Sequence, residues 1–75
     1  MRFYMQLVLK TEFGDYKGEQ KAVTQDQFDT VTSLSKSFYN ESGFEMTLED
    51  GSFIVVPPDL IKRSILVVTK GDFID

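Results

Sequence analysis

The sequence predicts an α+β fold in which one helix covers one face of a mostly antiparallel sheet. Apolar and polar residues alternate over residues 3–10 and 44–48, which is the period of a strand, whereas apolar residues recur at helical spacing from residue 28 to residue 38. Short turn signals between the strand segments favour antiparallel neighbours. The predicted order is β-β-α-β-β-β, in a single two-layer domain over residues 1–75.

The first strand is expected over residues 3–10. Its odd-numbered positions from Phe3 to Leu9 carry large apolar side chains on one face, because successive side chains of a strand alternate. The opposite face carries Tyr4 and Val8 among polar residues, so it is only partly polar. Apolar groups on both faces are typical of a central strand, and a central position is predicted.

A turn over residues 11–15, with Gly14-Asp15 at its tip, is expected to lead into a weaker strand over residues 16–23. This second strand is polar and contains Gly18, which favours a bulge. Charges and a bulge keep an edge strand from pairing with other chains, so an edge position is predicted.

The helix is expected to begin at Thr24, because Thr24 and Gln27 have the spacing of a capping box. Val23 and Phe28 flank this box as a hydrophobic staple. The apolar stripe of the helix comprises Phe28, Val31, either Leu34 or Ser35, and Phe38. Residues 40–43 end the helix, since Asn and Gly both accept left-handed geometry.

A hairpin is predicted at Asp50-Gly51, because a two-residue Asp-Gly loop forms a type I′ turn with positive φ at both residues. The same-face pairs in this register are Leu48 with Phe53 and Met46 with Val55. Ile54 and Val56 then point to the opposite face, so the second strand of the hairpin is apolar on both sides and is predicted to be central.

Pro57-Pro58 ends that strand, because proline cannot donate a ladder hydrogen bond, and Pro58 can open a helical turn over residues 59–62. The β-branched run at residues 65–68 predicts a last, well-buried strand, closed by Gly71 and Asp72. Residues 73–75 are expected either to fray or to be docked by Phe73.

Composition narrows the classes of function. The 75 residues include 12 acidic and 8 basic ones, a net charge of −4, which disfavours sequence-independent binding to nucleic-acid phosphates. There is no Cys and no His, so thiol nucleophiles, imidazole catalysis and zinc sites built from these residues are excluded. Without a catalytic motif or a glycine-rich phosphate loop, neither enzymatic activity nor a cofactor is predicted.

No segment resembles a targeting signal or the roughly 20 apolar residues of a membrane-spanning helix. A cytoplasmic location without membrane contact is therefore expected.

The carboxylates of Glu45, Glu49 and Asp50 form one candidate site, for a hard cation or for acid–base chemistry. Calcium takes six or more oxygens from a loop with alternating acidic positions, which this hairpin does not offer. A solvated hairpin tip, with Asp50 suited to the backbone geometry of the turn, is the favoured interpretation, and no metal is predicted.

Lys62-Arg63, with Lys70 and Lys10 as further candidates, is the only concentration of basic residues in the sequence and could hold an anion. Two charges beside Asp59 are more typical of a solvated rim. The second candidate set is aromatic and consists of Tyr4, Phe13, Tyr16 and Tyr39. Such rings can stack unpaired bases of single-stranded nucleic acid. Because acidic and basic residues are mixed around them, roles in the core or in subunit contacts are favoured.

The segment GFEMTLEDGSFIVVPP, with the serine-rich helix before it and the SILVV strand after it, resembles small, mostly uncharacterised proteins of tailed bacteriophages, marine and cyanobacterial ones included. The resemblance covers residues 24–68. It implies an intracellular protein of an infected bacterium or a minor virion component, which acts by binding a host enzyme or other virion subunits. No functional residues transfer with it.

The resulting hypothesis is a non-enzymatic protein–protein interaction module, which acts as a homo-oligomer or by binding a host or virion protein. Its predicted interface is the sheet face opposite the helix, with Tyr4, Ile54 and Val56. The alternative is nucleic-acid binding through Tyr4, Tyr16, Lys62 and Arg63. Acidic mimicry of DNA ranks third, because the acidic residues are spread along the chain and interleaved with lysine.

Overall fold

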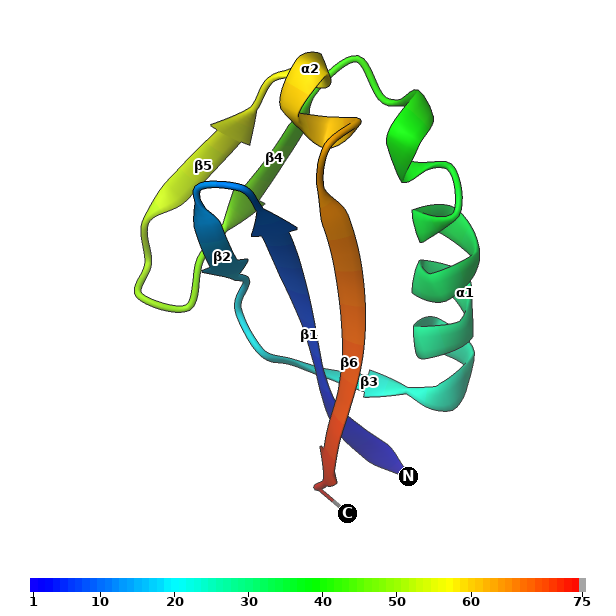
Figure 1. Cartoon of the computed structure of the whole chain (residues 1–75). Helices are drawn as coiled ribbons and strands as arrows, with labels where there is room; N and C mark the ends of the chain where they lie inside the picture. The colour runs from blue at the N-terminus through cyan, green and yellow to red at the C-terminus, as the bar shows by residue number, and fades with distance from the viewer. Residues whose placement is uncertain (75) are drawn as a thin grey trace.

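The computed structural model describes residues 1–74, so the expectation for Asp75 lies outside the described residues. It confirms the α+β class: in this part of the chain, six strands form two antiparallel sheets beside one main helix (Figure 1). The elements are β1 (Arg2–Thr11), β2 (Gly14–Lys17), β3 (Lys21–Thr24), α1 (Gln25–Ser35), η1 (Phe38–Asn40), β4 (Phe44–Thr47), β5 (Phe53–Val56), α2 (Pro58–Ile61) and β6 (Ile65–Phe73).

β1 is the central strand of the larger sheet, as predicted. One edge of β1 pairs with β6, and the other pairs with β3 near its N-terminal end and with β2 near its C-terminal end. The predicted second strand is therefore two strands, which separate at Gly18. The Gly18 N–H donates to the Leu7 carbonyl at 2.7 Å, and this contact holds the junction against β1.

The first hairpin turns earlier than predicted. Thr11 pairs with Gly14, so the tip is Glu12-Phe13 and Gly14 already belongs to β2. The Thr11 hydroxyl accepts the Phe13 N–H at 3.0 Å and donates to the Gly14 carbonyl at 2.9 Å. This side-chain bridge fixes the turn at Thr11, and Gly14 supplies the φ of 129° that follows it.

The capping box at Thr24 is confirmed: the Gln27 N–H donates to the Thr24 hydroxyl, and the Thr24 N–H donates to the Gln27 side chain. The helix nevertheless ends at Ser35, and Phe38 lies in η1 instead of in a continuing α-helix. Ser35 turns inward, whereas the exposed fraction of Leu34 is 68%. No helix in residues 1–74 has the length and apolar character needed to cross a membrane.

Hydroxyl groups explain this early end. The hydroxyls of Thr32, Ser35 and Ser37 donate to main-chain carbonyls three residues back, at 2.9 Å each. Such bonds compete with the helical ladder and favour its tightening to a 3-10 turn.

The β4–β5 hairpin is one residue out of the predicted register. Met46 pairs with Ile54, not with Val55. The loop has three residues, because the Leu48 N–H donates to the Ser52 carbonyl at 2.7 Å across it. Among the described loop residues only a glycine, Gly51 with φ of 89°, is left-handed, so Asp50 does not adopt the type I′ geometry.

A one-residue slip exchanges the two faces of a strand. Ile54 and Val56 therefore face the core with Met46, and Phe53 and Val55 face solvent with exposed fractions of 58% and 70%. β5 pairs with β4 alone within the described residues, so the predicted central position is wrong and β5 is an edge strand.

The C-terminal elements follow the prediction in part. Pro58 opens α2 as expected. β6 continues through Gly71 and Asp72 to Phe73, past its predicted end, because β1 extends far enough to pair with it. The start of β6 is less buried than predicted, since Ile65 is 61% exposed. At its end the Phe73 ring contacts Phe3 edge-on, at 5.9 Å between centroids, and also stays 61% exposed, so the terminus is paired but Phe73 is not buried.

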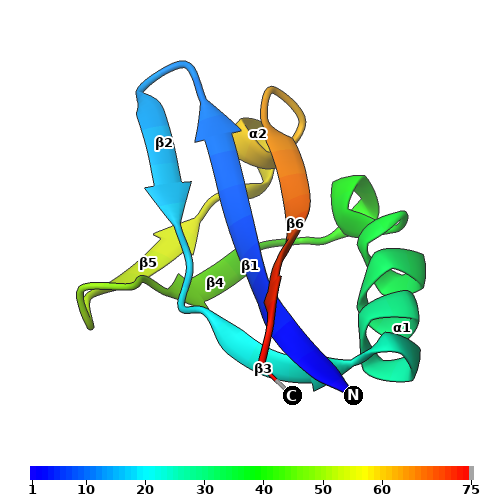
Figure 2. The same ribbon diagram turned by 90° about the horizontal axis from the view of Figure 1, so that it is seen from below.

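The core is divided into two clusters at the two ends of β1. The first consists of the buried Phe3, Met5 and Val23, with Phe28 and Val31 of α1 packed against them. The second consists of the buried Leu9, Phe38, Met46, Val56 and Ile61. Figure 2 shows α1 and the β4–β5 hairpin set apart along β1, so each covers a different part of the same sheet face.

Candidate functional site

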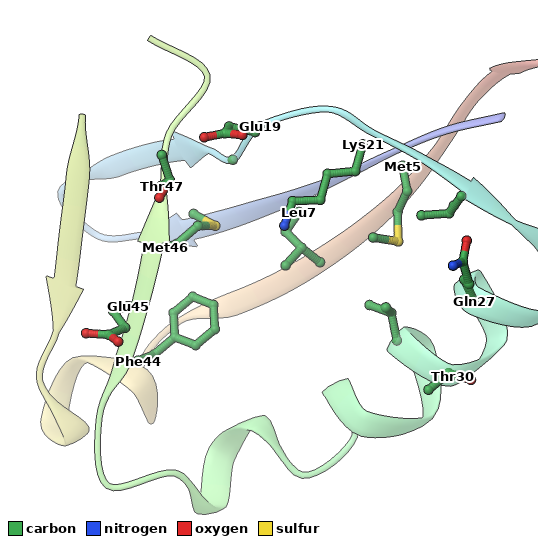
Figure 3. A pocket seen from close by; sticks show the side chains of 13 residues that line it. Met5, Leu7, Glu19, Lys21, Gln27, Thr30, Phe44, Glu45, Met46 and Thr47 are labelled. Atoms are coloured by element: carbon green, nitrogen blue, oxygen red, sulfur yellow. The ribbon is translucent and has the colours of Figure 1, made fainter. Parts of the chain in front are cut away.

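A groove lies between α1 and β4, over the middle of β1 (Figure 3). Met5 and Leu7 of β1 form its floor, Val31 belongs to the α1 wall, and Phe44 and Met46 belong to the β4 wall. The groove has a volume of about 790 Å³. A second hollow of about 370 Å³ continues it towards η1 and shares Leu7, Val31 and Phe44 with it.

The groove exists because the two core clusters do not close over Leu7. α1 has no fully buried residue, and its inward stripe is narrow, with Ser35 half-buried and Leu34 exposed at the rim. Leu7 and Phe44 pack against the second cluster but remain only half-buried, because the first cluster does not extend over them. The floor and one wall thus offer apolar surface to a ligand.

The β4 wall is also a strand edge. The Leu48 N–H bonds to Ser52 across the hairpin, so the alternation of an antiparallel ladder directs the main-chain groups of Glu45 and Thr47 away from β5. The Thr47 carbonyl confirms this direction, because it accepts the Glu19 N–H at 3.2 Å.

This edge is paired at one end only. Gly18 bridges to Leu48, and the Glu49 N–H donates to the Lys17 carbonyl at 3.0 Å. Beyond this point β3 and β4 do not pair. The Glu45 N–H and carbonyl, which face the groove side, have no hydrogen-bond partner among residues 1–74.

Charge is unevenly distributed around the groove. Glu19 lines the groove and Glu41 the second hollow, whereas Lys21 is the one basic residue in these linings among residues 1–74. Glu45 lines both through its main chain, because its side chain alternates with the inward Phe44 and Met46 and points away from the groove (Figure 3). A further hollow is lined by Glu19, Gln20 and Glu49, and it shares only Glu19 with the groove. The Glu49 carboxylate is bonded to Gln6, whose side chain alternates with Met5 and Leu7 and therefore lies on the other face of β1.

The residues predicted for a protein interface are not brought together. Val56 is 4% exposed within the second cluster, and Ile54 packs against that cluster. Tyr4 is 42% exposed and lies on the other face of the larger sheet, since it alternates with the inward Phe3 and Met5. The predicted face of Tyr4, Ile54 and Val56 is therefore wrong, because the hairpin register differs by one residue.

The residues predicted for nucleic-acid binding are also dispersed. Arg63 forms an ion pair with Glu12, beyond the C-terminal end of β1, whereas Tyr4 pairs with Ala22 near its other end. Tyr16 is half-buried against the second cluster, and Lys62 is exposed beside α2. Their arrangement offers no single surface for nucleic acid. Of the remaining aromatic candidates, Phe13 and Tyr39 are exposed by 72% and 47%, and the Tyr39 hydroxyl donates to the Ser64 carbonyl at 2.8 Å.

The carboxylates near the hairpin tip have separate partners. Asp50 accepts the Ser52 N–H at 2.9 Å and the Ser52 hydroxyl, and these bonds hold the pKa of Asp50 below its usual value. The Glu49 carboxylate accepts the Gln6 side-chain N–H at 3.0 Å. Within residues 1–74 no three acidic side chains gather closely enough to hold a metal ion.

The groove was not predicted from the sequence. Its defining residues, Leu7, Val31, Phe44 and Glu45, come from three separate elements. The one local signal is the narrow apolar stripe of the serine- and threonine-rich helix, which predicts incomplete cover of the sheet.

Comparison of the chain with protein-family models, with curated proteins and with solved structures finds no match in any of the three. The functional argument therefore rests on the groove itself.

Proposed function

We propose that this protein is a non-enzymatic protein–protein interaction module that binds a protein partner through the groove between α1 and β4. The proposal is carried by the accessible apolar surface of Leu7 and Phe44 at the centre of the fold. Accessible apolar groups in a concave surface, surrounded by a polar rim, are typical of binding sites.

The chemistry of the lining supports binding over catalysis. The charged side chains of the groove and of the second hollow are Glu19, Lys21 and Glu41, which are exposed and lie on different segments. The lining places apolar floor residues between separate polar side chains, which is the arrangement of an interface.

The proposal includes the setting that the resemblance over residues 24–68 implies. In this setting the protein is encoded by a tailed bacteriophage and acts in the host cytoplasm on a host or virion protein. The acidic composition, with a net charge of −4, is compatible with a freely diffusing binding protein.

Site-specific photo-crosslinking tests the binding surface. A photoactivatable phenylalanine derivative replaces Leu34, which is 68% exposed at the groove rim, or the control residue Ile65, which is 61% exposed on β6 outside the groove lining. In the cells that naturally express the gene, we expect a discrete protein adduct from position 34 and none from position 65. Equal adducts from both positions, or none from either, would contradict binding through the groove.

A second form of the proposal is self-assembly, for which the exposed edge of β5 is the specific observation. Phe53 and Val55 are exposed on a strand with one edge that no other described strand pairs, and such edges pair readily with another chain. Antiparallel pairing of β5 with its copy would join the two hairpins into one sheet and set these side chains beside their copies on one face of it.

Light scattering on a sizing column, over a range of concentrations, tests self-assembly. A homo-oligomer joined by β5 should return to the monomer mass in Val55→Lys, because a lysine on an edge strand opposes pairing. The control Thr32→Lys lies on α1, away from β5, and should keep the oligomer mass. A monomer at every concentration would remove self-assembly and leave a foreign partner.

A further inference from the structure

We propose that the groove accepts an extended peptide segment of a partner protein, which adds as a strand to the free edge of β4. Its apolar side chains would contact Leu7 and Phe44, and its Lys or Arg residues would lie near Glu19 and Glu41. This inference rests on the proposed function, since it names the class of partner that the groove binds.

The main chain of β4 supplies the first argument. The Glu45 N–H and carbonyl face the groove side and have no partner within the described part of the chain, and the Thr47 N–H points in the same direction. Strand addition uses such a pair of groups, because the peptide donates one N–H to the Glu45 carbonyl and accepts the Glu45 N–H in return. Gly18 and Glu19 already pair with the end of this edge, so its main-chain groups point away from β5 and towards a strand on the groove side.

The same groups distinguish an extended peptide from a helix. A helix satisfies its own main-chain groups internally, so it would leave the Glu45 N–H and carbonyl unpaired. An extended segment also places alternate side chains on one side, where Met5 and Leu7 of the floor and Val31 of the helix wall lie.

Charge indicates the composition of the segment. The carboxylate of Glu19 borders the groove and that of Glu41 borders the second hollow, against one ammonium group, that of Lys21, among the described lining residues. The whole chain has a net charge of −4. Complementary potentials favour a peptide with basic residues. The exposed strand of a second copy does not fit this requirement, because β5 has the sequence FIVV and no basic residue.

The test begins with selection from a displayed library of random peptides roughly twelve residues long, which exceeds the usual strand length. The full chain is the target. We expect the enriched peptides to alternate apolar with polar residues and to carry Lys or Arg. No enrichment, or enrichment of acidic peptides, would overturn the inference.

Two proline variants then locate the edge to which the best synthetic peptide binds. Glu45→Pro removes an N–H that faces the groove, and Val55→Pro removes the equivalent N–H on the outer edge of β5; neither bonds the two strands of the hairpin. Loss of one main-chain bond and steric interference by the proline ring should weaken binding about tenfold or more in Glu45→Pro. Val55→Pro should bind like the wild type, whereas equal weakening by both variants, or weakening by Val55→Pro alone, would overturn the inference.

Glu45→Gln separates the charge of this residue from its main chain. This variant keeps the N–H, so it should bind within a fewfold of the wild type and with a weaker dependence on salt. A loss as large as that of Glu45→Pro would show that the side chain, not the strand edge, carries binding, and would overturn the inference.

Modified peptides keep the test decisive if Glu45→Pro fails to fold. Two versions of the peptide are N-methylated at alternate residues. In the first version the N–H groups along one edge of the extended peptide are removed, and in the second version those along its opposite edge are removed. Strand addition predicts that only one set abolishes binding to the wild-type protein. Equal effects of the two sets would overturn strand addition, while a groove-specific crosslink from position 34 would still support the proposed function.

Discussion

Gly18 illustrates how one residue determines where two strands separate. Its N–H bonds to Leu7, and a Cβ at this position would lie 2.9 Å from the Met46 sulfur and 3.1 Å from the Leu7 carbonyl oxygen. Both neighbours belong to the groove lining, so a small residue at the junction brings β1 and β4 close enough to share one site.

We therefore expect Gly18→Ala to lower the free energy of unfolding by about 1–3 kcal/mol, because overpacking of this kind displaces neighbouring atoms. Urea denaturation measures the loss. Gly43→Ala is the matched control, since the nearest atom to its Cβ would be the Val56 carbonyl oxygen at an ordinary 3.8 Å. Similar losses in the two variants would contradict the importance of the close approach at Gly18.

Asp50 gives the hairpin tip a dependence on pH. Hydrogen bonds from the Ser52 hydroxyl and N–H lower the pKa of Asp50 from its ordinary value of 3.8. At pH values above the ordinary pKa, the ionised carboxylate of Asp50 therefore stabilises the folded state relative to the unfolded one. This stabilisation is lost as the pH falls through the lower pKa that Asp50 has in the folded state.

The variant Asp50→Asn keeps a side-chain acceptor for Ser52 but does not titrate. Its unfolding midpoint in urea should change less than that of the wild type between about pH 5 and about pH 2. Identical changes in the two proteins would show that the Ser52 bonds do not favour the ionised carboxylate.

At the scale of elements, the hairpin register decides which side chains reach the core. Ile54 packs against the second cluster, whereas Val55 is 70% exposed on the same short strand. Ile54→Ala should lower the free energy of unfolding by about 1–3 kcal/mol, since it removes partly buried methyl groups. Val55→Ala should change it by less than about 0.5 kcal/mol, as expected of a surface site. Thermal or urea unfolding of the two variants makes the comparison, and a larger loss in Val55→Ala would contradict the observed register.

The elements also show what the sequence can and cannot predict. The capping box at Thr24 and the proline start of α2 were predicted because each depends on a few neighbouring residues. The Asp50-Gly51 pair fits either a two-residue or a three-residue loop, because both loops need a glycine in the left-handed region. The two-residue loop also needs Asp50 in that region, and Asp50 does not adopt it. The choice between them is local, but its consequence, the exchange of Ile54 and Val55, extends along the whole strand.

The groove lies beyond sequence-based prediction for a different reason. Its floor and walls come from β1, α1 and β4, and no pattern within one segment shows how far apart two core clusters settle. The unpaired Glu45 main chain likewise depends on the divergence of β3 from β4 after the Gly18 junction.

At the scale of the whole molecule, the parts of the fold that pack on the two clusters differ in their local stability against unfolding. β1 pairs with three strands and supplies residues to both clusters, whereas α1 has no buried residue and packs by one stripe on the first cluster. A region with few buried apolar contacts opens at a lower free energy than the core. The wall of the groove formed by α1 should therefore open locally while β1 stays closed.

Native-state hydrogen exchange measures this difference residue by residue. The β1 amides that are bonded to β6 should exchange only on global unfolding. We expect the free energy of the openings that expose the α1 amides to be lower than this by at least about 1–2 kcal/mol. A peptide bound between β4 and α1 should raise protection in α1 more than in β1, because it adds apolar contacts to the weaker wall. Equal protection of α1 and β1 in the free protein would mean that the two clusters unfold as one unit, and that the groove is a rigid site instead of one that tightens around its partner.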